Sequence, residues 1–204
     1  MRHTVMGFVG LAMMLAVTAA PAAGHAAAAE AVIKETTDQV LGKLRAEGES
    51  LKSDPGKLYA LIDELILPRF DFKQMSKWVL GRYWRQASPE QRDAFVAQFQ
   101  RLLVQTYGQA LVNYRDQQVV FQPSRERSES EVTVRAEIDQ GAGPRIPIVY
   151  EMHKVGEEWL VYDVAVEGVS LVINYRSSFA QAIKRSGIDG LIERLAEKNG
   201  ASSG

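Results

Sequence analysis

Beyond residue 29, the sequence contains few side chains of the types and spacing that catalysis or metal binding requires. The chain has three histidines and no cysteine, and His153 is the one histidine after residue 29. Catalytic triads and dyads need a histidine beside the nucleophile, and structural zinc sites need several histidine or cysteine ligands. His153 falls on a predicted strand with solvated neighbours. We therefore expect neither a triad nor a metal site.

Asp163 and Ser170 are the remaining residues that could take part in acid–base or acyl-transfer chemistry. Ser170 lies between Gly168 and Val172 in a Gly-Val-Ser-Leu-Val stretch, which lacks the Gly-x-Ser-x-Gly spacing of a nucleophile elbow. Its position suits a helix cap better. Asp163 lies among apolar residues, where a buried carboxyl could act as an acid or base, but we favour a structural carboxylate near Arg176. We expect no catalytic residue and no cofactor.

The first 29 residues have the pattern of a secretory leader. Arg2 and His3 precede an uncharged run that ends in an alanine-rich tract reaching Ala29. We predict a signal peptide over residues 1–29, with cleavage between residues 22 and 29. The apolar run is short for a membrane-spanning helix, so an uncleaved anchor is the minor alternative. Without cysteine there is no lipid-attachment site or disulfide, and we expect a soluble protein exported to the periplasm.

The charge of the mature chain gives no support to nucleic-acid binding. The whole chain has 24 basic and 25 acidic side chains, and residues 1–29 contain one arginine and no acid. Removal of the leader leaves 23 basic and 25 acidic side chains, a formal charge of −2. Such a balance provides no bulk attraction to phosphate backbones. We expect no nucleic-acid partner.

Apolar residues recur at intervals of three and four from residue 30 to about residue 114, which predicts helices. The first predicted helix covers about 30–51. Asp54-Pro55 starts the second, because aspartate suits the cap and proline the first helical position, and Pro68 ends it. Asp71 is expected to cap a short helix that ends at Gly81. These helices precede the predicted strands.

A capping box marks the start of the longest predicted helix. Ser88 is expected to cap it, Pro89 to occupy its first turn, and Gln91 to reach back to the cap. Its apolar stripe runs from Phe95 to Tyr114, with Gly108 as a weak point.

After Tyr114 the apolar period changes to two, which predicts strands. The expected strands are 119–122, closed by Pro123, then 131–138, 145–154 and 159–166. Four successive strands joined by turns indicate an antiparallel meander. Glu167 to Ser170 joins the last strand to a helix that ends at Gly187, and a short helix follows. The order predicts one α+β domain over 30–198, with a flexible tail at 199–204.

Basic and aromatic residues alternate between positions 69 and 85. The cations are Arg69, Lys73, Lys77, Arg82 and Arg85. In an exported protein, such a segment could bind a lipid phosphate or an acidic partner surface. A solvated basic face around core aromatics is an equally good interpretation.

Two long stretches resemble the MlaC family, also called the toluene-tolerance proteins. One covers residues 166–179, reading Val-Glu-Gly-Val-Ser-Leu-Val-Ile-Asn-Tyr-Arg-Ser-Ser-Phe, and the other runs from Arg69 to Phe95. The resemblance implies helices on a curved four-stranded antiparallel sheet, a nuclear-transport-factor-like cone with an apolar cavity. It also implies a periplasmic phospholipid carrier that helps to maintain outer-membrane lipid asymmetry. Its implied partners are an inner-membrane ABC transporter complex and an outer-membrane lipoprotein–porin complex, with phospholipid as cargo rather than cofactor.

A long helix laid across a concave sheet would present its inner residues to the space between them. On the resemblance we expect lipid contacts at Phe70, Met75, Val79, Phe99, Leu103, Tyr107, Ile146, Ile148, Tyr150, Val164, Val166 and Leu171. Arg82 and Arg85, just after Gly81, are expected to be exposed and to dock on an acidic partner. The residues alone favour a filled core. The alternatives are a small periplasmic enzyme or a protein-binding adaptor on the same cone.

Overall fold

The structure, a computed structural model, describes residues 24–113 and 117–201. Its first half is helical: α1 (His25–Ser53), α2 (Pro55–Leu61), the π-helix η1 (Ile62–Ile66), the 3-10 helix η2 (Leu67–Arg69), α3 (Phe72–Leu80), α4 (Arg82–Gln86) and α5 (Pro89–Val112). The strands β1 (Gln118–Ser128), β2 (Glu131–Asp139), β3 (Ile146–Val155), β4 (Glu158–Val166) and β5 (Val169–Ser170) follow, and then α6 (Leu171–Ala201). The fold is the expected α+β type.

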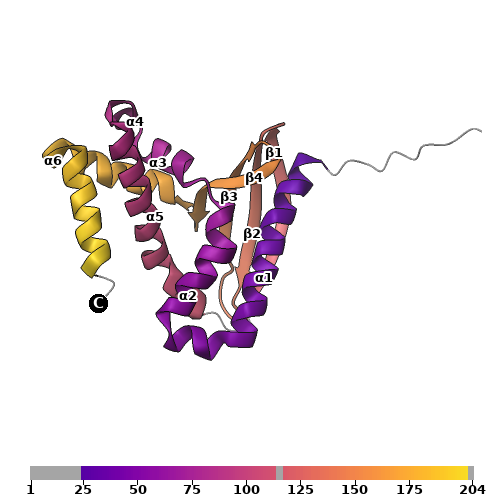
Figure 1. Cartoon of the computed structure of the whole chain (residues 1–204). Coiled ribbons are helices and arrows are strands. Elements are labelled where there is room, and N and C mark those ends of the chain that lie inside the picture. Colours follow the sequence, from indigo (N-terminus) through magenta and orange to yellow (C-terminus); the bar gives the residue numbers. More distant parts are fainter. Residues whose placement is uncertain (1–23, 114–116, 202–204) are drawn as a thin grey trace, which may run out of the picture.

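The five strands form one antiparallel sheet in chain order. The sheet has one strand more than predicted, because β5 adds a two-residue rung beside the end of β4. In Figure 1, α1 lies along the sheet, whereas α3, α5 and α6 form a separate group of helices. The two groups are joined at one end through α2. This arrangement leaves an inner face of the sheet opposite the long helix α5.

The predicted helix starts are confirmed by hydrogen bonds. Asp54 accepts from the amides of Gly56 and Lys57, and Asp71 accepts from the amide of Gln74 at 2.8 Å. Ser88 and Gln91 form the expected reciprocal capping box. Each cap provides acceptors for amides that have no partner within the helix.

Several sequence-based boundaries were wrong, and the first helix begins at His25 rather than at residue 30. β1 continues through Pro123 to Ser128 because the proline falls in a bulge of an edge strand, where its missing amide leaves no ladder hydrogen bond unmade. The helix predicted over 55–68 becomes the π-helix η1 after Leu61. Residues 199–201, predicted to begin a flexible tail, belong to α6, and the buried Asn199 donates from Nδ2 to the Gln98 carbonyl. Residues 1–23, 114–116 and 202–204 lie outside the described residues.

Buried apolar residues form three clusters. The first joins α3, α5 and α6 around Phe95, Phe99 and Phe179. The second joins the start of α1 to the sheet, and the third joins α1 to α2. The helical group and the sheet thus have separate cores, which meet only along part of their surfaces.

Candidate functional site

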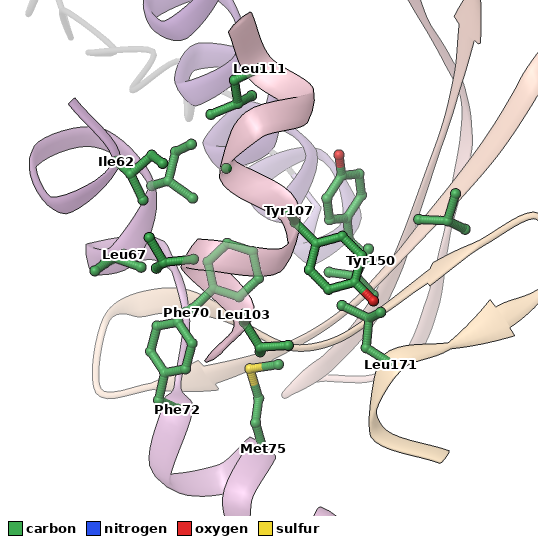
Figure 2. A pocket seen from close by; sticks show the side chains of 15 residues that line it. Ile62, Leu67, Phe70, Phe72, Met75, Leu103, Tyr107, Leu111, Tyr150 and Leu171 are labelled. Carbon is green, nitrogen blue, oxygen red and sulfur yellow. The ribbon is translucent and has the colours of Figure 1, made fainter. Parts of the chain in front are cut away.

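An apolar cavity of about 290 Å³ lies where the three clusters meet. Figure 2 shows side chains from α5, η1, η2, α3, the sheet and the start of α6 around it. The lining residues are Ile62, Ile66, Leu67, Phe70, Phe72, Met75, Leu103, Val104, Tyr107, Gly108, Leu111, Tyr150, Val164, Val166 and Leu171. Two tyrosine hydroxyls are the polar side-chain groups in this set. The cavity therefore suits an apolar ligand.

The helical wall depends on the irregular turns η1 and η2, which provide Ile62, Ile66 and Leu67. Pro68 explains why a regular helix does not continue here, because its ring would clash with the carbonyl of residue 64. On the facing helix, a Cβ at Gly108 would lie only 3.0 Å from Ile62 Cδ1. The absence of a side chain at Gly108 lets η1 approach α5 closely. π-Helical turns are rare and often accompany functional sites.

The sheet wall comes from neighbouring strands in register. Tyr150 on β3 pairs with Val164 on β4, and both line the cavity together with Val166. Burial raises the pKa of Tyr150 to about 12, so its hydroxyl stays protonated at neutral pH. The sheet therefore presents one neutral hydroxyl group among aliphatic side chains.

The joint between β4 and α6 fixes Leu171 against the cavity. Glu167 and Gly168 have φ of 52° and 80°, which turns the chain back into β5. Ser170 Oγ accepts from the Ile173 amide at 3.1 Å and donates to Asp163, whose other oxygen accepts from the Val172 amide. The capping role expected for Ser170 is confirmed, and Asp163 is a structural carboxylate. The hydrogen-bond partners of Asp163 are therefore Ser170 and the Val172 amide at the start of α6. The Arg176 side chain, expected near Asp163, lies next to Gly81 instead.

A second link holds the aromatic residues of the cavity next to the sheet. The Asp71 amide donates to the Val161 carbonyl at 2.9 Å, and Asp71 Oδ2 lies 3.1 Å from His153 Nε2. Phe70 and Phe72, on either side of Asp71, stack with ring centroids 5.8 Å apart. The role of His153 is thus to tie the sheet to the start of α3, which the sequence alone did not indicate.

Tyr107 is the most exposed of the residues that line the cavity. This side chain is 41% exposed, and every other lining residue is at least half-buried. Tyr107 also interacts with Tyr175 at the start of α6. Burial first and Tyr107 second raise the pKa of Tyr175 to about 12.

The structure brings eight of the twelve predicted contact residues to the cavity: Phe70, Met75, Leu103, Tyr107, Tyr150, Val164, Val166 and Leu171. Val79 and Phe99 lie instead in the packed core between α3, α5 and α6. Ile148 packs against the core between α1 and the sheet, and Ile146 lies at the start of β3 outside the lining. Lipid contact at each of the twelve residues stays a prediction.

The predicted contacts did not include the part of the wall that η1, η2 and the end of α5 provide. Ile62, Ile66 and Leu111 fall on the apolar stripes of their predicted helices but are not among the twelve expected lipid contacts. No periodicity distinguishes a residue that faces another side chain from one that faces a cavity. Arg82 and Arg85 are exposed, as expected, on the short helix α4.

Within residues 24–113 and 117–201, no group of histidine, aspartate and glutamate side chains could hold a metal ion. No helix in this described part is long and apolar enough to cross a bilayer.

Residues 34–197 match the model of the family described as MlaC protein. The chain belongs to the MlaC family. Among curated relatives of this MlaC-family chain, toluene tolerance protein ttg2D of Pseudomonas putida is 33% identical over 78% of this chain and 74% of its own length. The intermembrane phospholipid transport system binding protein MlaC of Haemophilus influenzae is 28% identical, over 81% of this chain and 79% of its own length.

A solved structure of another bacterial protein has the same fold as this MlaC-family chain. It is the phospholipid-binding protein of Ralstonia solanacearum in complex with a phospholipid, 34% identical in sequence. The two structures superpose with a TM-score of 0.79 over 86% of this chain and 99% of that one. The printed names of the Haemophilus influenzae and Ralstonia solanacearum proteins describe phospholipid transport and phospholipid binding.

Proposed function

We propose that this MlaC-family protein is a periplasmic phospholipid carrier that encloses acyl chains in the cavity beside Tyr107. The observation that carries the proposal is the lining itself, which is apolar except for two tyrosine hydroxyls. A similar protein binds a phospholipid, and a relative is named for intermembrane phospholipid transport. We propose that the cargo moves between an outer-membrane lipoprotein–porin complex and an inner-membrane ABC transporter complex.

The energetics of transfer explain why a carrier needs such a cavity. Each methylene withdrawn from water contributes about 0.8 kcal/mol, so two chains of roughly sixteen carbons represent on the order of 25 kcal/mol. That free energy would be lost if the chains crossed the periplasm in water. A bilayer offers nearly the same stabilisation as the cavity, so the exchange is close to balanced. Direction then comes from the donor and acceptor complexes, and the carrier needs no cofactor.

The size of the cavity implies that its walls move when lipid enters. About 290 Å³ lies at the lower end of the volumes of small-molecule sites, which span about 300–1,000 Å³. Two acyl chains need more space than that. The cavity lies between separate cores, so the helical group and the sheet can move apart without either core being opened.

Extraction of the purified protein tests the proposal. We expect organic extraction followed by mass spectrometry to recover phospholipid in a fixed ratio to protein, and the delipidated protein to take up phospholipid from vesicles. Protein that is repeatedly free of lipid and takes up none from vesicles would contradict a carrier function.

A further inference from the structure

Tyr150 places a hydroxyl group inside an otherwise aliphatic part of the cavity. Its side chain projects from β3 among the lining residues, as Figure 2 shows. Its partners in the sheet register are Val134 on β2 and Val164 on β4, both apolar. Ile62, Leu103 and Val166 line the same space. Among the lining residues, Tyr107 is the one other residue with a polar side-chain group.

Among the described residues, no hydrogen bond joins the Tyr150 hydroxyl to another protein group. Burial is the one cause of its raised pKa, which is about 12, so neither a charge nor a hydrogen-bond partner contributes. Tyr107 differs in this respect, because it interacts with Tyr175 and is 41% exposed. Tyr150 is half-buried, and its hydroxyl faces the apolar cavity without a protein partner, so a ligand in the cavity can supply the acceptor.

The structure limits what kind of acceptor can satisfy this hydroxyl. A protonated tyrosine donates one hydrogen bond, and the surrounding side chains are too apolar to accommodate a charged acceptor such as a phosphate. The ligand must therefore bring a neutral oxygen into an apolar space. In a diacyl phospholipid, the ester carbonyl at the head of each chain is such a group.

We propose that the Tyr150 hydroxyl donates a hydrogen bond to an ester carbonyl oxygen of the bound lipid. Tyr150 then distinguishes acyl-ester lipids from ether lipids, which have the same chains without the carbonyl. This inference rests on the carrier function proposed above. It places the glycerol end of the lipid next to Tyr150, with the acyl chains extending along the aliphatic lining.

Competition between two lipids tests this role. Delipidated protein is incubated with fluid vesicles that contain equal amounts of a diacyl phosphatidylglycerol and its dialkyl ether counterpart, with the same head group, chain length and unsaturation. The lipid recovered with the protein is quantified by mass spectrometry. We expect the wild-type protein to enrich the ester lipid about fivefold, the effect of one ordinary hydrogen bond. We expect Tyr150→Phe, which removes only the hydroxyl, to take up both lipids equally.

Tyr162→Phe is the matched control, because Tyr162 lies on β4 with its ring against His153 and outside the cavity lining. It should keep the wild-type ester preference. Equal uptake of both lipids by the wild type, or an ester preference that persists in Tyr150→Phe, would overturn the inference while leaving the carrier function in place. Failure of the wild type to take up either lipid would overturn both proposals.

Discussion

Val79 and Val166 have identical side chains but different surroundings. Val79 is 1% exposed and packs between α3, α5 and α6, whereas Val166 ends β4 and lines the cavity. A carboxylate introduced at position 166 can stay hydrated, because water can enter the cavity when lipid is absent. At position 79 the same group would be surrounded by packed side chains and lose its hydration.

We therefore expect Val166→Asp to fold, with stability lowered by about 1–3 kcal/mol, and to lose bound lipid. Val79→Asp should lower stability by several kcal/mol through desolvation of the carboxylate, a large part of the roughly 5–15 kcal/mol of a typical domain. Circular dichroism melts and lipid extraction on the same preparations measure both effects. A folded Val166→Asp that retains its lipid would show that this wall does not face the chains.

The residue types predicted the helix-capping hydrogen bonds correctly. They predicted only part of the cavity lining, because the packing of neighbouring helices decides which side chains face the cavity. Ser88, Asp71 and Ser170 cap helices as their types and positions indicate. Phe99 and Leu103 are one helical turn apart on the same stripe of α5 and belong to the same buried core, yet of the two Leu103 alone also lines the cavity. Their different surroundings depend on how α3 and α6 pack against α5, and the sequence of α5 alone carries no information on that packing.

At the scale of elements, the contact between η1 and α5 controls the shape of the helical wall. Gly108 lies in the middle of this contact, and the nearest atom to a Cβ there is the flexible end of Ile62. Replacement by alanine removes the low helix propensity of glycine at the cost of a small shift of Ile62. Replacement by leucine would also fill part of the cavity.

We expect Gly108→Ala to stabilise the protein by up to about 1 kcal/mol and to keep lipid binding. We expect Gly108→Leu to fold but to bind less lipid, because its side chain occupies the space of an acyl chain. Thermal melts and lipid uptake from vesicles separate the two effects. Undiminished uptake by Gly108→Leu would place the chains elsewhere.

Gly187 divides α6 into two parts with different directions. Its φ of 73° and ψ of −178° fall in a region that only glycine enters readily. We expect Gly187→Ala to lower stability by about 1–3 kcal/mol. Gly200→Ala in the same helix, where a Cβ meets no atom within 4 Å, should change stability little. Equal melting temperatures for the two variants would contradict this role of Gly187.

The sequence predicted this break at Gly187 and the antiparallel meander, because glycine and the two-residue period leave direct signals. It did not predict η1, since a five-residue π-helical turn is too short to change the apolar spacing of the segment. It placed a strand end at Pro123 because it could not show that β1 is an edge strand, where a proline at a bulge is tolerated.

At the scale of the whole molecule, a carrier must also dock on its donor and acceptor. We propose Arg82 and Arg85 on α4 for this role, since both are exposed and α4 adjoins the end of α3. Reversal of both to glutamate should leave the melting temperature nearly unchanged and slow lipid delivery to partner complexes, most strongly at low salt. Reversal of the exposed pair Lys184 and Arg185 on α6 is the control with the same charge change. Equal delivery by both variants would support a merely solvated basic face.

The contacts at the start of α1 favour an early cleavage site for the predicted signal peptide. Ala29 is fully buried against the sheet, and the rings of His25 and Trp159 contact each other at 6.1 Å. Cleavage at residue 29 would remove these contacts. We therefore expect N-terminal sequencing of the exported protein to begin near residue 23 to 25, the early end of the predicted interval. A mature chain that starts at residue 30 would contradict this.

Photochemical crosslinking of a bound lipid tests most directly whether the acyl chains occupy this cavity. The protein is loaded with a phospholipid that carries a photoreactive group in one acyl chain, irradiated, digested and examined by mass spectrometry. We expect adducts on lining residues from both walls, such as Leu103 and Tyr107 on α5 and Val164 on β4. Adducts confined to exposed apolar residues outside the lining, such as Trp78 and Ile173, would contradict enclosure of the chains in this cavity.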